Sequence, residues 1–407
     1  MIHSLLLAGM LAAARIGAGG DVAWFQGGFD DAVREASKAH KLVLVDFRIA
    51  ICDACAKLDT DTYSNAAVAS AMKDFVCVTI DAQSKAGAPL ARRFVVSGYP
   101  TLVFLDPDGA VRDRIVATLP PDRFLRELKR IQSGEGTVTD ARAKAAAAPG
   151  DPFARLELAS ALRRVNDSAG ALAEIEAAKR AIKAGQGFDL KSTDVRWALS
   201  QKLADLGDGA AAREELAALH ALDPEGKSIA SRRAKLQELT HAVNVAYAKT
   251  HSVDAKPLIA FLRSETEPDV LFEGWNVVQR TELYQVNDAR KRESPDEEEF
   301  HRAAWRDAGR EAWKWCPQDK IADWGAGFAA AMYEDAAHLT DAEKSLAVDV
   351  ATRAAEAAPK SPDHLEVLAC CLFAAGKRED ALRTLKTAMD IDPSRESLKK
   401  RMTEFLK

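Results

Sequence analysis

The sequence lacks several patterns that mark common kinds of protein. Lysine and arginine total 56 and aspartate and glutamate total 61, so the formal charge is only −5 and neither sign dominates. A protein that gathers nucleic acid by electrostatics carries a strong basic excess, and this class is therefore excluded. Hydrophobic residues make up 47% of the chain and charged residues 29%, a balance typical of globular rather than disordered proteins.

Long apolar runs are also missing. After residue 20, no uncharged apolar stretch approaches the roughly 18 residues that a membrane-spanning helix needs, so we expect no membrane span in the mature chain. Residues 4–14 form a shorter apolar stretch, followed by small residues over 17–20, as in a secretory leader. No lysine or arginine precedes this stretch, and a disordered leader is the alternative. We predict a signal peptide over residues 1–20 and a periplasmic or secreted location.

Signatures of several enzyme classes are lacking. The sequence has no Ser-His-Asp cluster, no phosphate-binding loop and no pair of histidines at metal-binding spacing, so we predict neither a cofactor nor a metal. Cysteine is scarce, with six residues in a chain of 407. This number is too small for a scaffold held together by disulfides. Cys52 and Cys55 form a C-x-x-C pair, which is where chemistry is expected first. A zinc site at this pair is disfavoured, because no second C-x-x-C or C-x-x-H completes four ligands.

The first folded segment, residues 29–132, alternates between helical and strand-like patterns. Helical periodicity predicts helices over residues 29–40, from the cysteine pair to 72, over 89–94 and over 121–131. Short β-branched apolar runs predict strands over residues 42–47, 75–80, 101–105 and 111–117. A strand–helix–strand half followed by a hairpin and a helix implies an α/β domain, with a central mixed sheet and helices on both faces.

Three motifs surround the cysteine pair. The first is Val45-Asp46-Phe47, with Asp46 six residues before Cys52. The second is the pair itself, Cys52-Asp-Ala-Cys55, which opens a helix, and the third is Gly98-Tyr99-Pro100-Thr101, which precedes a later strand. With these motifs, about 110 residues resemble a thioredoxin-like domain of the kind found in exported bacterial redox proteins. The resemblance implies a thiol–disulfide oxidoreductase that acts on protein thiols and disulfides.

Cysteine chemistry and the resemblance together assign roles. A cysteine at a helix N-terminus faces unpaired N–H groups that stabilise its thiolate, so Cys52 is the expected nucleophile. Cys55, one helical turn further on, is expected to resolve the mixed disulfide. The resemblance implies that Asp46 is a buried carboxylate with a raised pKa that takes the Cys55 proton. It also implies a cis-proline loop that pairs with a client segment like a strand, formed by Tyr99, Pro100 and Thr101.

Two features depart from the usual pattern of this family. Ile51 stands where an aromatic residue usually precedes the first cysteine, and Asp53-Ala54 replaces the common Gly-Pro type. The Asp53 carboxylate disfavours a neighbouring thiolate, so we expect a less reactive thiol and a pair closer to a reductant than to a strong oxidant. A structural or idle pair is the competing interpretation. Cys77, in a predicted strand, is expected to be a core residue rather than a third redox thiol.

About a fifth of the residues are alanine, the best helix former, and from residue 151 the pattern is helical almost to the end. Small and large residues recur there at the offsets of a tetratricopeptide repeat, a pair of antiparallel helices. The clearest set is Leu365, Leu368, Ala369, Leu372, Gly376, Ala381, Leu385, Ala388 and Pro393. We predict a thioredoxin-like domain over residues 21–133, a linker over 134–150, tetratricopeptide-like helical repeats over 151–240, a divergent helical region over 241–319 and further repeats over 320–407.

The divergent region is rich in tryptophan, since five of the seven tryptophans lie between Trp275 and Trp324. Aromatic residues at helical spacing usually fill a core, and a groove for a peptide or glycan is the alternative. The charged run over residues 288–299 is expected to be a solvated loop. Stacked helix pairs contact protein partners, so we expect chemistry in the first domain and binding in the repeats. A non-catalytic protein-binding scaffold is the competing hypothesis.

Overall fold

The computed structural model describes residues 22–185 and 188–407. The predicted signal peptide over residues 1–20 lies outside the described residues. The chain divides between Leu222 and Asp223 into two compact units, and each is described by itself. Within the described ranges, no helix is both long and apolar enough to cross a membrane.

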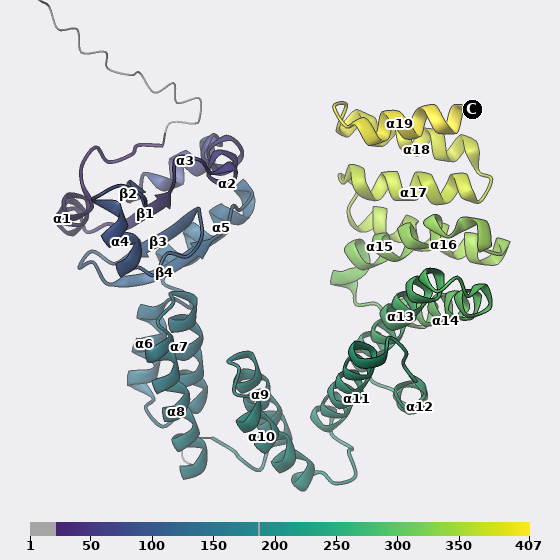
Figure 1. Ribbon diagram of the computed structural model, residues 1–407, viewed down its shortest axis with the longest axis horizontal. Helices are drawn as coiled ribbons and strands as arrows, with labels where there is room; N and C mark the ends of the chain where they lie inside the picture. Colours follow the sequence, from purple (N-terminus) through teal and green to yellow (C-terminus); the bar gives the residue numbers. More distant parts are fainter. Residues whose placement is uncertain (1–21, 186–187) are drawn as a thin grey trace, which may run out of the picture. The chain divides into compact units, whose positions relative to one another are not determined.

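A mixed sheet forms the centre of the first unit (Figure 1). In the described part of the chain it runs in the order β2-β1-β3-β4, where the strands are β1 (Leu42–Arg48), β2 (Phe75–Asp81), β3 (Thr101–Leu105) and β4 (Val111–Val116). Strand β1 pairs in parallel with β2, whereas β3 pairs antiparallel with both β1 and β4. The predicted α/β fold with a central mixed sheet is therefore confirmed.

Helices cover both faces of this sheet. They are α1 (Phe29–Ala39), α2 (Asp53–Lys57), the π-helix η1 (Leu58–Tyr63), α3 (Ala66–Met72), α4 (Gly87–Arg93) and α5 (Pro121–Ser133). Val43, Val45 and Phe47 of β1 pack in a core with α1 and α4, whereas Leu44 packs on the opposite side with η1, α3 and α5. Because side chains alternate along a strand, Asp46 shares the face of Leu44. The carboxylate thus lies on the side of the sheet that η1 covers.

The stretch from the cysteine pair to residue 72 is broken into pieces, whereas the sequence predicts one helical stretch. Helix α2 runs directly into η1, and the break comes at Asn65. The Asn65 side chain accepts hydrogen bonds from the backbone N–H groups of Ala67 and Val68, which caps the start of α3. The π-helix places Asp59 and Tyr63, four residues apart, against β1.

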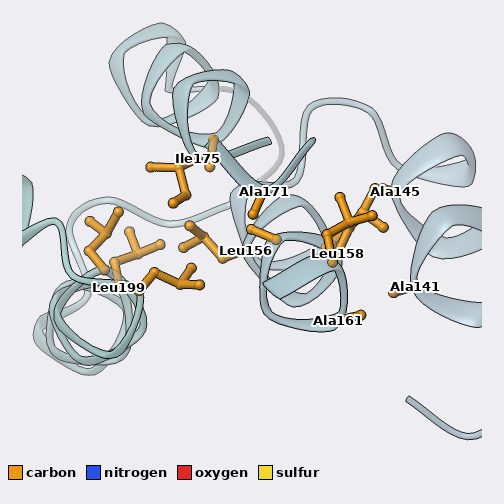
Figure 2. Close-up of a cluster of buried hydrophobic side chains, with 14 of the residues drawn as sticks. Ala141, Ala145, Leu156, Leu158, Ala161, Ala171, Ile175 and Leu199 are labelled. Atoms are coloured by element: carbon orange, nitrogen blue, oxygen red, sulfur yellow. The ribbon is translucent and has the colours of Figure 1, made fainter. Parts of the chain in front are cut away.

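Helices α6 to α10 complete the first unit. Their bounds are α6 (Val138–Ala147), α7 (Pro152–Arg164), α8 (Ser168–Ala184), α9 (Thr193–Asp205) and α10 (Gly209–Leu222). A core of alanine and leucine side chains joins α7 to its neighbours. Figure 2 shows Leu158 directed toward Ala141 of α6, and Leu156 on the side of Ile175 of α8 and Leu199 of α9. Small residues let these helices approach closely, as expected for stacked helix pairs.

Polar contacts join the sheet to α7. Asp113 on β4 is fully buried, and its carboxylate accepts hydrogen bonds from Arg130 of α5 at 2.8 Å and from Arg164 of α7 at 2.9 Å. Asn166, just after α7, donates to the backbone carbonyl of Val95 at 3.0 Å. The segment predicted as a linker holds α6, which packs against both α7 and β4. Helices α6 and α7 are therefore anchored to the sheet.

The second unit is helical throughout its described length. Its helices are α11 (Ile229–Thr250), α12 (Lys256–Ser264), α13 (Pro268–Lys291), α14 (Pro295–Lys314), the 3-10 helix η2 (Gln318–Lys320), α15 (Ile321–Glu334), the 3-10 helix η3 (Ala336–His338), α16 (Asp341–Ala357), α17 (Pro362–Ala374), α18 (Arg378–Ile391) and α19 (Glu396–Leu406). Ala369 of α17 and Leu385 of α18 are fully buried, and Gly376 forms the turn between these helices at φ +76°. The predicted tetratricopeptide-like helix pair is confirmed here.

The tryptophan-rich region mostly fills a core. Trp305 and Trp313 are buried, and the ring of Trp313 stacks on that of Trp324, with centroids 6.2 Å apart. The Trp324 indole N–H donates to the Asn276 side chain at 3.1 Å. Trp315 is 37% exposed and lies at the end of α14. The core expectation is therefore met for Trp305 and Trp313, and the partly buried Trp324 packs against them.

The charged run over residues 288–299 is solvated but is not a loop. Helix α13 continues to Lys291 and α14 begins at Pro295, so only three residues separate the helices. Glutamate, lysine and arginine are good helix formers, and they keep the run helical despite its charge. The predicted loop is therefore wrong.

Candidate functional site

The predicted cysteine pair is a disulfide at the start of α2. The Cα atoms of Cys52 and Cys55 are 5.2 Å apart, and the backbone N–H of Cys55 donates to the Cys52 Sγ at 3.1 Å. Cys52 is partly exposed, whereas Cys55 is only 3% exposed. A reaction partner can therefore reach the first sulfur more readily than the second.

Asp46 is the buried carboxylate nearest in sequence to this pair. It is fully buried, and the Tyr63 hydroxyl donates to its Oδ2 at 3.4 Å. Its Oδ1 has no hydrogen-bond partner among residues 22–185 and 188–407. Burial raises the pKa of Asp46 to about 6, against an opposing effect of the nearby Arg48 guanidinium. Such a group holds or releases a proton close to neutral pH.

Arg48 and Asp59 belong to the same cluster and were not singled out from the sequence. The Arg48 Nη2 donates to the backbone carbonyl of Cys55 at 3.0 Å and to the Asp59 carboxylate at 2.9 Å. The Arg48 Nε lies 3.7 Å from the Asp46 Oδ2. A sequence signal does exist, because Arg48 follows Asp46 by two residues in a strand and so shares its face. Asp59 follows Cys55 by four residues in a helical segment, which also places them on one side.

The third predicted motif forms a loop before β3. The peptide bond between Tyr99 and Pro100 is cis. Thr101 pairs with Phe47 of β1 and with Val116 of β4, and its hydroxyl donates to the Gly98 carbonyl at 2.7 Å. Tyr99 is partly exposed, whereas Thr101 is fully buried and holds the loop from inside.

Exposed apolar side chains flank these elements. Ile51, directly before the disulfide, is 91% exposed, and Val116, opposite Thr101 on the edge strand, is 53% exposed. Asp53, between the two cysteines, is exposed to solvent. Single exposed apolar side chains are ordinary on a protein surface, but Ile51 is directly adjacent to the disulfide.

The remaining cysteines are poor thiolates. Cys77 is buried in β2, as expected for a core residue, and burial raises the pKa of its thiol to about 12. Burial likewise raises the thiol pKa of Cys371 to about 12, and those of Cys316 and Cys370 to about 11. Thiolate formation near neutral pH is therefore disfavoured at these four positions.

Comparison with known proteins agrees with this geometry. The sequence model of a thioredoxin-like family matches residues 23–107. Residues 23–107 form a thioredoxin-like domain. The match covers the cysteine pair, Asp46 and the cis-proline loop.

Two curated relatives align with the thioredoxin-like domain. The thiol:disulfide interchange protein DsbD of Ralstonia nicotianae is 31% identical over 104 residues, which are 25% of this chain and 17% of the relative. The chloroplastic thioredoxin-like protein HCF164 of Oryza sativa is 32% identical over 108 residues, which are 26% of this chain and 40% of the relative. The chain thus spans less than half the length of either relative.

A solved structure resembles the helical remainder. It is the C-terminal part of a TPR repeat-containing protein from Cytophaga hutchinsonii, with 14% sequence identity and a TM-score of 0.37. The alignment covers 66% of this chain and 93% of that chain.

Proposed function

We propose that the thioredoxin-like domain exchanges thiols and disulfides with protein clients through Cys52 and Cys55. The observation that supports this proposal is an accessible sulfur bonded to a buried sulfur, with a buried carboxylate, Asp46, in the same cluster. The two curated relatives are named for thiol–disulfide exchange and for a thioredoxin-like fold.

In the reducing direction the reaction has two steps. The Cys52 thiolate attacks one sulfur of a client disulfide, so a Cys52–client bond forms and a client thiolate leaves. Cys55 then gives its thiol proton to the Asp46 carboxylate and attacks the Cys52 sulfur, which releases the second client thiolate. Two electrons pass to the client, and the pair becomes the disulfide. A small dithiol such as dithiothreitol restores the reduced pair for another turnover.

Insulin reduction by dithiothreitol tests the proposal. The wild-type chain is expected to accelerate it, and Cys52→Ser is expected to fall to the rate without protein. Equal rates for wild type and Cys52→Ser would instead support the alternative, a protein-binding scaffold whose disulfide is idle. This alternative is included because Ile51 and Asp53 depart from the usual pattern of the thioredoxin-like family.

The direction of exchange is proposed to be reducing. The exposed Asp53 carboxylate adjoins Cys52 and disfavours its thiolate, and an oxidant gains its power from a stabilised thiolate. Equilibration of the full chain with glutathione redox buffers measures the potential. A value near about −120 mV, typical of strong periplasmic oxidants, would contradict a reducing role.

The client segment is proposed to lie along the cis-proline loop. Tyr99 and Pro100 would pair with it through their backbone, in the manner of an added strand. Ile51 and Val116 supply exposed apolar surface near the same loop, and Thr101 holds the loop in place by its hydrogen bond to Gly98.

The helical repeats are proposed to hold a protein partner or the client itself. Stacked helix pairs offer a continuous surface for such contacts. Cys55→Ser leaves the mixed disulfide unresolved, so the full chain would trap a client on Cys52. Chemical cross-links from the trapped client to helices α7–α19 would support the proposal, and cross-links confined to the thioredoxin-like domain would contradict it.

An extracytoplasmic location is proposed for the protein. Disulfides persist in oxidising compartments, and the apolar stretch over residues 4–14 resembles a secretory leader. N-terminal sequencing of the chain recovered from the periplasm of an expressing bacterium tests this. A new N-terminus near residue 20 is expected, and an intact N-terminus in the cytoplasm would contradict it.

A further inference from the structure

We propose that Arg48 is a positioning residue of the disulfide site, which ties the carboxylates of Asp46 and Asp59 to the backbone of the resolving cysteine, Cys55. This inference rests on the proposed function, because positioning matters only if the pair exchanges disulfides. It assigns to this guanidinium a role in the second step of exchange, when Cys55 must lose its proton.

The contacts of Arg48 come from separate elements. The residue ends β1, while Cys55 lies in α2 and Asp59 in η1. One guanidinium nitrogen, Nη2, donates to the Cys55 carbonyl at 3.0 Å and to the Asp59 carboxylate at 2.9 Å. Another, Nε, lies 3.7 Å from the Asp46 carboxylate. A planar guanidinium suits several acceptors at once. This one hydrogen-bonds to Asp59 and to the backbone of Cys55, and it places its positive charge beside Asp46.

The Arg48 side chain is partly buried between two carboxylates of different exposure. Its exposed fraction is 22%, that of Asp59 is 43% and that of Asp46 is zero. The guanidinium therefore stands between a solvent-facing carboxylate and a buried one. The buried carboxylate cannot gain hydration, so its ionisation depends on the cation beside it.

The charges that face Asp46 come from the strands and helices packed around it. Arg48 of β1 lowers the pKa of Asp46 and Asp59 of η1 raises it. Tyr63 of η1 and Cys77 of β2 also interact with Asp46, but burial raises both of their pKa values well above neutral, so they stay uncharged. The disulfide of α2 does not titrate. Among the described residues, Arg48 is thus the cation that opposes the effect of burial and lowers the pKa of Asp46.

The consequence falls on resolution of the mixed disulfide. The Cys55 Sγ–H bond breaks, its proton goes to an Asp46 oxygen, and the Cys55 sulfur forms a bond to the Cys52 sulfur as the client thiolate leaves. An Asp46 that already holds a proton cannot accept this one. Loss of the guanidinium should therefore slow the second step at neutral pH while leaving the first attack by Cys52 comparatively unaffected.

A carboxyl titration tests the inference without requiring catalysis. The carboxyl ¹³C signal of Asp46 is followed by NMR in the oxidised full chain, for the wild type and the variants Arg48→Met and Arg48→Lys. The expected result for Arg48→Met is an increase of about tenfold or more in the proton affinity of Asp46, the lower end of the effect of an opposite charge at such a distance. Arg48→Lys keeps the charge but loses the planar guanidinium, so an intermediate value is expected.

Two further variants control the experiment. Asp59→Asn removes the carboxylate that opposes Asp46 ionisation, so it should shift the Asp46 titration in the opposite direction, to lower pH. This sign is not produced by general destabilisation, and it keeps the test decisive if Arg48→Met does not fold. Arg112→Met removes a partly buried β4 arginine paired with Asp106, away from the cluster, and should leave the Asp46 titration unchanged.

Kinetics separates this inference from the proposed function. In single turnovers with a disulfide peptide, Arg48→Met should accumulate the mixed disulfide at pH 7 and recover its resolution rate at higher pH, with Arg48→Lys between it and wild type. Absence of insulin reduction by the wild type would defeat the proposed function but would leave the titration meaningful. An active wild type whose Asp46 titration is the same in Arg48→Met and Asp59→Asn would overturn the role of Arg48.

Discussion

Arg164 of α7 donates a hydrogen bond at 2.9 Å to Asp113 of β4, a fully buried carboxylate 51 residues earlier in the chain. The same carboxylate accepts from Arg130 of α5 at 2.8 Å. The sheet and helix α7 are therefore joined through one buried carboxylate. We expect the sheet and α7 to unfold together rather than as independent parts.

Substitution of Asp113 tests this coupling. Asp113→Ala strands two guanidinium groups, and we expect it to lower the free energy of unfolding by about 3 kcal/mol, the low end for a broken buried pair because both arginines are partly exposed. Arg164→Met should cost less, since Arg130 still pairs with Asp113. Urea unfolding followed by circular dichroism measures both. Asp122→Ala, which breaks a solvent-exposed pair with Arg126, is the matched control and should lower the free energy of unfolding far less than Asp113→Ala does.

The raised pKa of Asp46 predicts a cost to stability with a defined pH dependence. Because the folded pKa is about 6 and the ordinary value is 3.8, the folded chain binds more protons between about pH 4 and pH 6, and stability falls as pH rises through this window. Asp46→Asn should therefore stabilise the oxidised protein at pH 7 by about 3 kcal/mol. The gain should vanish near pH 4. Equal unfolding free energy of Asp46→Asn and wild type at both pH values would contradict the shift.

Exposure of Ile51 predicts an effect on clients and none on folding. The side chain is 91% exposed, so Ile51→Ser removes little that stabilises the free protein. If a client covers it, the lost contact is worth about 1.5–3 kcal/mol, which raises KM for insulin about tenfold or more. Leu172→Ser, at an exposed leucine of α8, is the control and should leave KM unchanged. Equal KM values for the two variants would argue that the client does not cover Ile51.

A glycine-to-alanine substitution is expected to have opposite effects on stability at Gly376, in the turn between α17 and α18, and at Gly327, inside α15. Gly376 has φ +76° with open space around its Cα, so Gly376→Ala meets no clash but forces a left-handed alanine, at a cost of about 1–2 kcal/mol. Gly327 lies inside α15, also with open space, and Gly327→Ala should stabilise by about 0.5–1 kcal/mol. Thermal unfolding of the two variants checks the sign of each change.

The site residues that lie close in sequence were accessible to prediction. Asp46, Cys52 and Cys55 sit at fixed spacings along one strand and one helix turn, so a motif can locate them. Arg48 and Asp59 meet only because η1 packs against β1, and that packing depends on a π-helix that hydrophobic periodicity does not reveal. Local spacing places Arg48 on the face of Asp46 and Asp59 on the side of Cys55, but the contact between Arg48 and Asp59 is tertiary and no local pattern encodes it.

Hydrophobic periodicity predicted most helices and strands correctly. It failed where another local preference, such as side-chain capping or helix propensity, determined the structure. The boundary at Asn65 is set by side-chain capping, which a continuous apolar pattern hides. At residues 288–299, charge favoured a loop while helix propensity favoured continuation, and propensity prevailed. The boundaries of the predicted domains stay predictions, because the division into two compact units between Leu222 and Asp223 does not test them.

The raised pKa values of the other thiols, three of them buried and Cys316 partly buried, give the protein a built-in reporter. With thiol pKa values of about 11 to 12 at Cys77, Cys316, Cys370 and Cys371, brief maleimide labelling of the native chain near neutral pH should be slow at these four positions. The mass added by such a label then counts only the opened Cys52–Cys55 pair. The oxidation state of the wild-type protein can thus be read from an intact mass spectrum, even in a crude extract, without first removing any cysteine.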